Sequence, residues 1–191
     1  LTISILALFR IPPVQLPAGS GARGFAAVRE GLDYVRGNRI VFGAISLDMF
    51  AVILAGATAM LPIYARDILM VGAGELGWLR GAPALGAAAV AFWLTRNPLG
   101  ERVGQKMFVN VGLFAIATVG FGLSTVLWVS LATLVVMGAA DMVSVYVRSS
   151  LIQLHTPDSM RGRVSSVSLL FVSASNELGE FRAGVMAAAI G

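Results

Sequence analysis

Residues 126–152 read VLWVSLATLVVMGAADMVSVYVRSSLI, an apolar stretch that contains two charged residues, Asp141 and Arg148. A helix needs about 20 mostly apolar residues to cross the hydrocarbon core of a bilayer. This stretch meets that length, and it therefore predicts a membrane-spanning helix.

Three other stretches have a similar length and composition. Residues 40–64 contain one charge, Asp48; residues 76–94 contain Arg80 near their start; and residues 107–123 contain none. Each stretch predicts a further span, so we expect an all-α, polytopic membrane protein.

Residues 164–191 predict a fifth span, although Glu177, Glu180 and Arg182 interrupt it. Small residues recur there at every fourth position, a pattern that lets membrane helices approach one another closely. These small residues are Gly179, Ala183, Ala187 and Gly191.

The overall composition agrees with a chain that mostly faces lipid. Apolar residues make up 57% of it and charged residues 13%, against about 25% charged residues in soluble domains. The chain has no cysteine and one histidine, which excludes disulfides, thiol nucleophiles and multi-histidine metal sites. We expect no cofactor, and no catalytic motif predicts an enzyme.

The basic residues indicate orientation rather than nucleic-acid binding, because they lie at the ends of the apolar stretches. Lys and Arg resist translocation, so the connections that hold them are expected to be cytoplasmic. These connections precede the first full span and follow the second and fourth; they hold Arg10, Arg23, Arg29, Arg36, Arg39, Arg96, Arg102, Lys106, Arg161 and Arg163.

The chain before the first full span divides into two parts. Residues 1–9 are too short to span a bilayer, and we interpret them as the end of a helix that begins outside this sequence. Residues 10–39 are predicted to be a cytoplasmic linker that contains an amphipathic helix, with Phe25, Val28, Leu32 and Val35 on one face. This helix fits either the membrane interface or a solvated linker. Residues 40–191 form the predicted bundle.

The loop Asn97-Pro-Leu-Gly-Glu-Arg-Val-Gly-Gln-Lys106 resembles the Gly-x-Leu-x-Asp-Arg-x-Gly-Arg-Lys loops of the major facilitator superfamily. Leu99, Arg102, Gly104 and Lys106 match that pattern, and Glu101 replaces the aspartate. Asn97 and Gln105 depart from it. The resemblance implies a gating loop formed by Glu101, Arg102, Gly104 and Lys106; the alternative is a basic loop that only fixes topology.

A longer, ordered resemblance points to the enterobactin-exporter-like branch of that superfamily, the transmembrane secretion effectors. The segments that carry it are MGAADMVSV at 137–145, VRSSLIQL at 147–154, TPD at 156–158, MRGRV at 160–164 and ASNELGEF at 174–181.

This resemblance implies a twelve-helix, proton-driven exporter of small molecules such as siderophores or drugs, located in the bacterial cytoplasmic membrane. The chain would run from the end of the sixth helix to the eleventh, with the last helix missing. Membrane lipid, a small-molecule substrate and the N-terminal six-helix bundle of the same protein are then its expected partners. The alternative is a truncated, transport-incompetent fragment that acts at most as a membrane interaction partner.

Two carboxylates within the predicted spans are candidate proton or substrate groups, because a carboxylate at bilayer depth is costly unless it is paired or hydrated. Asp141 lies deepest, and Asp48 lies about two turns into its stretch. Asp48 could instead be an interfacial or packing carboxylate. Arg148 shares a helical face with Asp141 but lies about 10 Å away along the axis, too far for direct contact without a long side-chain reach or an intervening water.

Asn176, Glu177 and Glu180 form a third group of candidates in the last stretch. Glu177 and Glu180 are three residues apart, and Asn176 and Glu180 are four apart, so each pair shares a helical face. In a spanning helix these side chains would face the bundle interior or a hydrated cavity. In a helix that does not span, they would form an ordinary solvated end.

Two shorter motifs have a structural interpretation. Thr156, Pro157 and Asp158 predict a helix start with Thr156 as the N-cap. The glycines at 72, 74 and 77 match a dinucleotide-binding spacing, but they follow a predicted membrane helix instead of a strand, so we expect a turn there.

Overall fold

The structure is a computed structural model, and it describes residues 24–55, 57–97, 100 and 103–190. Helices are the only regular secondary structure among these residues, which confirms the all-α part of the predicted fold class. The helices are α2 (Phe25–Gly37), α3 (Arg39–Ala55), α4 (Leu61–Ile63), α5 (Ala73–Arg96), α6 (Val103–Leu123), α7 (Leu127–His155) and α8 (Asp158–Ile190).

Two of the described helices, α6 and α7, are long and apolar enough to cross a membrane by length and composition. Helices α5 and α8 have 24 and 33 residues, which correspond to about 36 and 50 Å at 1.5 Å per residue. Both exceed the thickness of a hydrocarbon core, about 30 Å, but they carry more polar residues. Five spans therefore remain a prediction.

The first predicted span is not one continuous helix. Helix α3 ends at Ala55, and a 3-10 turn, Ala57–Met60, leads into α4. Pro62 lies in the first turn of α4, where its missing N–H costs no intrahelical hydrogen bond. A π-helical turn, Tyr64–Ile68, then leads toward α5.

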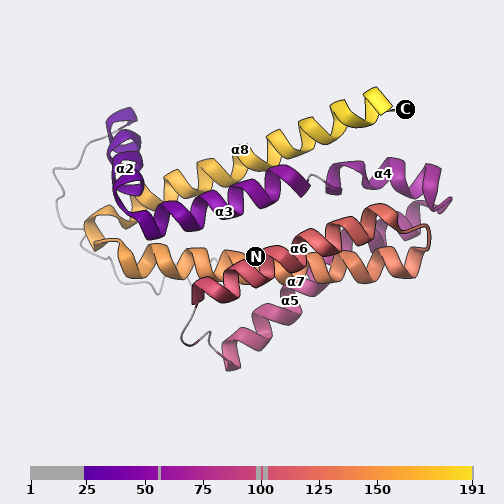
Figure 1. Cartoon of the computed structure of the whole chain (residues 1–191), viewed down its shortest axis with the longest axis horizontal. Helices are drawn as coiled ribbons and strands as arrows, with labels where there is room; N and C mark the ends of the chain where they lie inside the picture. The colour runs from indigo at the N-terminus through magenta and orange to yellow at the C-terminus, as the bar shows by residue number, and fades with distance from the viewer. Residues whose placement is uncertain (1–23, 56, 98–99, 101–102, 191) are drawn as a thin grey trace, which may run out of the picture.

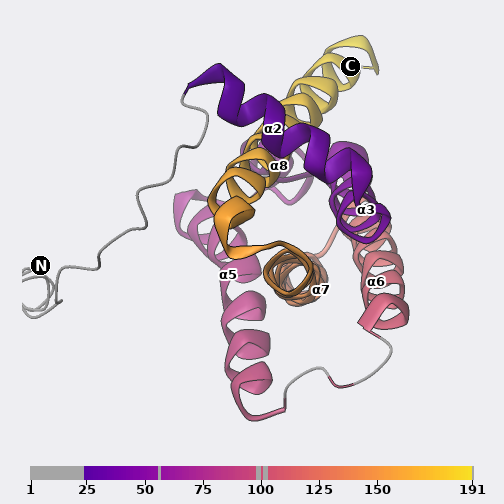
Figure 2. The same cartoon turned by 90° about the vertical axis from the view of Figure 1, so that its left-hand side faces the viewer.

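Helix α7 occupies the middle of the bundle. In Figure 2 it is seen end-on, with α5 on one side, α3 and α6 on the other, and α8 above. Its buried residues agree with this position, because they cover more than half of its circumference; they include Ser130, Leu134, Met137, Val143 and Val147.

The helices alternate in direction (Figure 1). Helices α3, α6 and α8 begin at the same end of the bundle at which α5 and α7 end. We call this end the basic end, since it carries Arg36, Arg39, Arg96, Lys106, Arg161 and Arg163. The predicted connections with many basic residues are thus brought together in space.

Helices α5 and α7 approach each other so closely that their contact requires glycine. A Cβ atom on Gly138 would collide with the carbonyl group of Pro83, and one on Gly86 would collide with the carbonyl group of Val135. The same face of α5 buries Leu79, which is fully inaccessible. The α5–α7 contact therefore combines close backbone packing with an apolar core.

Helix α2 packs on the basic end of the bundle. Its Val35 is buried, and a Cβ atom on Gly31 would lie 3.0 Å from the Arg163 carbonyl oxygen of α8. Glu30 forms a 2.7 Å ion pair with Arg163, and the Tyr34 hydroxyl donates a hydrogen bond to the carbonyl of His155. Location of α2 in the membrane interface remains a prediction.

The predicted N-cap at Thr156 is wrong. Helix α8 begins at Asp158, while Thr156 is the C-cap residue of α7 and its hydroxyl has no hydrogen-bond partner among the described residues. The carbonyl of Pro157 accepts the first hydrogen bonds of α8, from Met160 and Arg161. Pro157 therefore occupies the N-cap position, and it has no side-chain oxygen that could cap the helix.

We expect Gly138→Ala to lower the free energy of unfolding by about 1–3 kcal/mol, because the new methyl group would force α5 and α7 apart. Gly112→Ala on α6 is the matched control, since no atom lies within 4 Å of a Cβ atom there. That change should leave stability equal or raise it slightly. Tryptophan fluorescence during unfolding in detergent measures both; equal effects would contradict the close contact.

Candidate functional site

The candidate functional site is an ion pair between the two helices α3 and α7. Nη1 of Arg148 on α7 contacts Oδ2 of Asp48 on α3, and the side chains are only 9% and 6% exposed. Asp48 is nine residues after the start of α3, about 14 Å along its axis. The pair therefore lies well inside the bundle rather than at its end.

Apolar side chains exclude water from one side of this pair. Ala44, one turn before Asp48, packs with Met107, Val143 and Val147 in a buried cluster between α3, α6 and α7. A charge in such surroundings is costly without a partner, and its attraction to a partner is weakly screened. The ion pair thus neutralises two charges, each of which would be costly without the other.

A polar pocket opens on the other side of Arg148. This pocket has a volume of about 220 Å³ and lies between α7 and α8, toward the basic end. Its polar lining residues are Arg148, Ser149, Gln153, Ser165 and Ser168. Arg148 therefore connects the buried pair to a space that can hold water or a polar group.

Asp141 lies on the same face of α7 as Arg148. Ser144, which is buried, stands between them, at spacings of three and four residues. Asp141 is half-buried and has no ion pair or hydrogen bond in the described part of the chain. The structure thus places Asp141, Ser144 and Arg148 in one polar row along α7, and within this row Arg148 is paired with Asp48.

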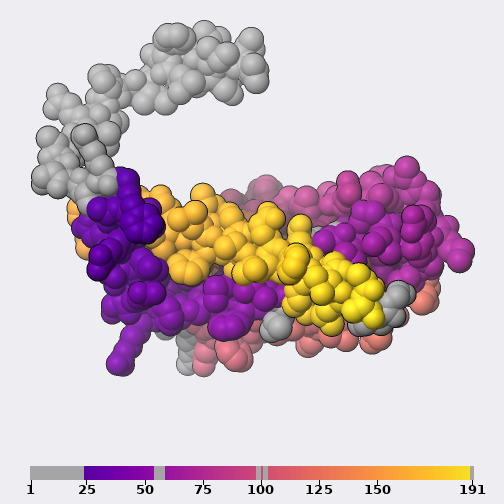
Figure 3. Space-filling model, turned by 90° about the horizontal axis from the view of Figure 1, so that it is seen from above, coloured from indigo at the N-terminus to yellow at the C-terminus, as the bar shows by residue number. Residues whose placement is uncertain are grey.

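The candidates on α8 are not joined to this site. Asn176, Glu177 and Glu180 are exposed, and no hydrogen bond or ion pair links them to other described residues. Figure 3 shows α8 lying across the surface of the molecule. Large apolar side chains share this exposed surface of α8: Leu169, Leu170, Leu178, Phe181, Val185 and Met186.

The small residues of α8 contact α3. A Cβ atom on Gly179 would lie 2.9 Å from the Val52 carbonyl oxygen, too close for any residue larger than glycine. Nε of Arg182 donates a 3.0 Å hydrogen bond to the Ile53 carbonyl. The helix that packs closely against the row of small residues at Gly179 is therefore α3.

The predicted gating loop lies partly outside the described residues. Glu101 and Arg102 belong to the part that the structure does not describe. Gly104 is exposed in the first turn of α6, and Lys106 is half-buried, with its carbonyl accepting a 2.7 Å hydrogen bond from Asn110. A gating ion pair in this loop remains a prediction.

A second buried polar cluster, which the sequence analysis missed, lies at the opposite end of the bundle. The hydroxyl of Tyr64 is 2.6 Å from the Phe121 carbonyl and also contacts the Ser124 carbonyl. Ser130 donates a 3.0 Å hydrogen bond to Ser124. Serines in apolar stretches are too common for their spacing alone to predict such a cluster.

The exposed charges at this opposite end form a local pair. Nε of Arg66 lies 2.6 Å from Oδ1 of Asp67, and the hydrogen bond that Arg66 donates lowers the pKa of Asp67. No group of three potential metal ligands occurs among the described residues.

Comparison with known proteins identifies one family. The family model described as "Transmembrane secretion effector" matches residues 4–191, nearly the whole chain. No curated protein and no solved structure matches.

We expect Asp48→Asn and Arg148→Gln to lower the free energy of unfolding by about 3–5 kcal/mol each, because each leaves a buried charge unpaired. The double variant should lose clearly less than the sum of the two, since both charges are then absent. Asp67→Asn, which breaks an exposed pair, is the control and should change nothing measurable. Additive losses in the double variant would contradict a direct ion pair.

Proposed function

The chain belongs to the transmembrane secretion effector family of the major facilitator superfamily, a family of transporters rather than enzymes, and on this basis we propose that it exports small molecules in exchange for protons. Its family makes it a membrane protein and a secondary transporter. Siderophore-like or drug-like compounds are the proposed substrates, and the bacterial cytoplasmic membrane is the proposed location.

The observation that carries the proton coupling is the buried pair of Asp48 and Arg148. As a carboxylate, Asp48 neutralises Arg148 and holds α3 against α7. When Asp48 accepts a proton, the attraction is lost and a buried cation remains. The cation then needs a new partner, which makes protonation a driving force for moving α3 relative to α7.

The polar pocket beside Arg148 supplies the place for that new partner. Its serine and glutamine side chains, which include Ser149, Gln153 and Ser168, can hydrogen-bond a polar substrate next to the guanidinium group. The substrate and the Asp48 carboxylate would thus compete for Arg148: protonation of Asp48 frees the guanidinium group to bind a substrate, and deprotonation of Asp48 displaces it. Such competition links substrate binding to the protonation state of Asp48.

Asp141 fits the role of a second proton carrier. It lies two turns from Arg148 along α7, toward the end opposite the basic end, with buried Ser144 between them. A proton arriving from that side would reach Asp141 before it reaches Asp48. A carboxylate within a span, without a partner in the described chain, is suited to bind a proton reversibly.

The exposed polar residues of α8 are proposed to contact substrate in the complete transporter. In transporters built from two repeated bundles, the substrate site lies between the bundles. Asn176, Glu177 and Glu180 point away from the other described helices, which is consistent with a hydrated cavity shared with the N-terminal six-helix bundle.

Efflux from membrane vesicles driven by a pH gradient tests this function. The protein is expressed from the uninterrupted reading frame that contains this chain, and ethidium and enterobactin serve as probes. We expect Asp48→Asn and Asp141→Asn to reduce efflux at least tenfold, because each removes a group that binds protons reversibly.

Asp67→Asn is the control for this assay, since Asp67 is exposed and outside the predicted spans, and it should retain efflux. Efflux by both the Asp48→Asn and the Asp141→Asn variants at normal expression would contradict the proton-coupling role. If the complete reading frame transported neither probe, the alternative of a transport-incompetent membrane interaction partner would be favoured.

A further inference from the structure

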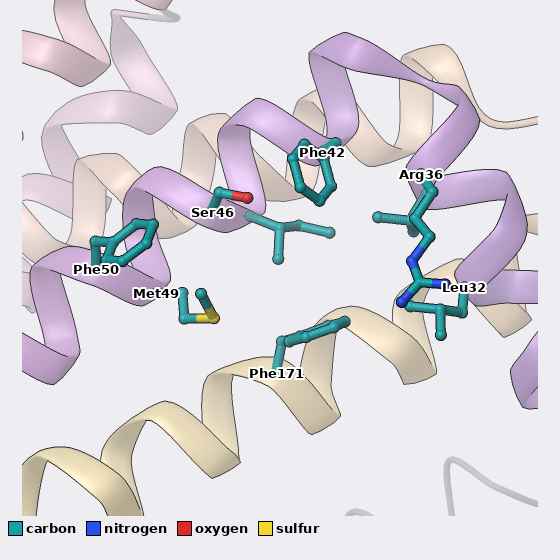
Figure 4. A pocket seen from close by; sticks show the side chains of 9 residues that line it. Leu32, Arg36, Phe42, Ser46, Met49, Phe50 and Phe171 are labelled. Atoms are coloured by element: carbon teal, nitrogen blue, oxygen red, sulfur yellow. The ribbon is translucent and has the colours of Figure 1, made fainter.

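An apolar groove lies where α2, α3 and α8 meet (Figure 4). It has a volume of about 350 Å³. Its apolar lining includes Leu32 of α2, Phe42, Met49 and Phe50 of α3, and Phe171 of α8. The groove is separate from the pocket beside Arg148, with which it shares no residue.

The groove has the length and depth of a lipid chain in one leaflet. Its α3 wall runs from Phe42 to Phe50, and eight residues of helix rise about 12 Å. Half of a hydrocarbon core is about 15 Å thick. Because Phe42 and Phe50 are half exposed, this wall faces outward from the described helices, where lipid can reach it.

One cation stands at the mouth of the groove. Arg36, the only charged residue of the lining, extends from α2 toward Phe171 (Figure 4). It has no ion pair among the described residues, whereas neighbouring Glu30 is already paired with Arg163. Arg36 lies just before α3 begins, which is the depth of lipid headgroups if α3 enters the membrane there.

We propose that this groove binds an anionic phospholipid, with one acyl chain against Phe42, Phe50 and Phe171 and the headgroup phosphate on Arg36. Basic pockets beside membrane helices select anionic headgroups by charge. The planar guanidinium group of Arg36 can donate two parallel hydrogen bonds at once, a geometry that matches phosphate oxygens. The basic end of the bundle adds Arg39, which is also exposed and lies three residues before Phe42, on the same face of α3.

The bound lipid would connect the linker helix to the bundle. Its phosphate contacts α2, while its acyl chain contacts α3 and α8. Helix α3 also carries Asp48, so the lipid would act on the helix that holds the candidate site. Site and groove are nevertheless independent, and the lipid proposal holds whichever ion or substrate is transported.

Native mass spectrometry of the protein from its uninterrupted reading frame tests this binding, with phosphatidylglycerol and phosphatidylethanolamine as the probes. We expect preferential retention of phosphatidylglycerol. Arg36→Gln should weaken it about fivefold, the change expected for one arginine near an anionic surface. Arg29→Gln is the matched control, because Arg29 is an exposed arginine of the same helix that does not line the groove.

A second variant tests the acyl-chain half of the proposal. Ser46 lies in the groove, and Ser46→Trp would fill it while leaving Arg36 in place. We expect this variant to lose retention of phosphatidylglycerol while its helical circular dichroism stays unchanged. Equal retention of the two lipids, equal effects of Arg29→Gln and Arg36→Gln, or full retention by Ser46→Trp would each overturn the proposal. Failure of transport would leave these lipid measurements unaffected.

Discussion

Helix α7 contacts α3, α5, α6 and α8, so a polar group on its buried face needs a partner inside the protein or contact with a hydrated pocket. Arg148 pairs with Asp48, and Ser130 hydrogen-bonds to Ser124 at the other end of the bundle. Asp48 comes from a helix that is far away in sequence, and Ser124 comes from the turn that precedes α7. The need to satisfy these groups at low dielectric constrains which helices can lie beside α7 and in which register.

The contacts around α7 are of two physical kinds. Against α5, Gly86 and Gly138 permit backbone contact, which leaves almost no room for adjustment. Against α3, the contact combines the apolar cluster around Val147 with one ion pair, whose strength depends on protonation. A bundle with one rigid and one charge-dependent helix contact can keep its core while one helix changes position, as alternating access requires.

The charged residues of the described chain serve different purposes according to their depth. Those at the basic end, such as the pair of Glu30 and Arg163, join α2 to the bundle. Those within the helices are few, and the structure separates them into a paired group around Asp48 and an outward-facing group around Glu177. Separation of this kind is consistent with one proton-binding region and one surface reserved for the rest of a transporter.

The sequence by itself determined the all-helical class, the concentration of basic residues at one end and the choice of Asp48 and Asp141 as candidates, because length, hydropathy and the cost of a buried charge are local properties. Only the tertiary structure decided that Arg148 pairs with Asp48, that Gly179 meets α3 and that Glu177 and Glu180 are exposed. Helical periodicity tells which residues share a face of one helix, but it does not tell which other helix that face meets. That choice depends on the simultaneous packing of all the helices.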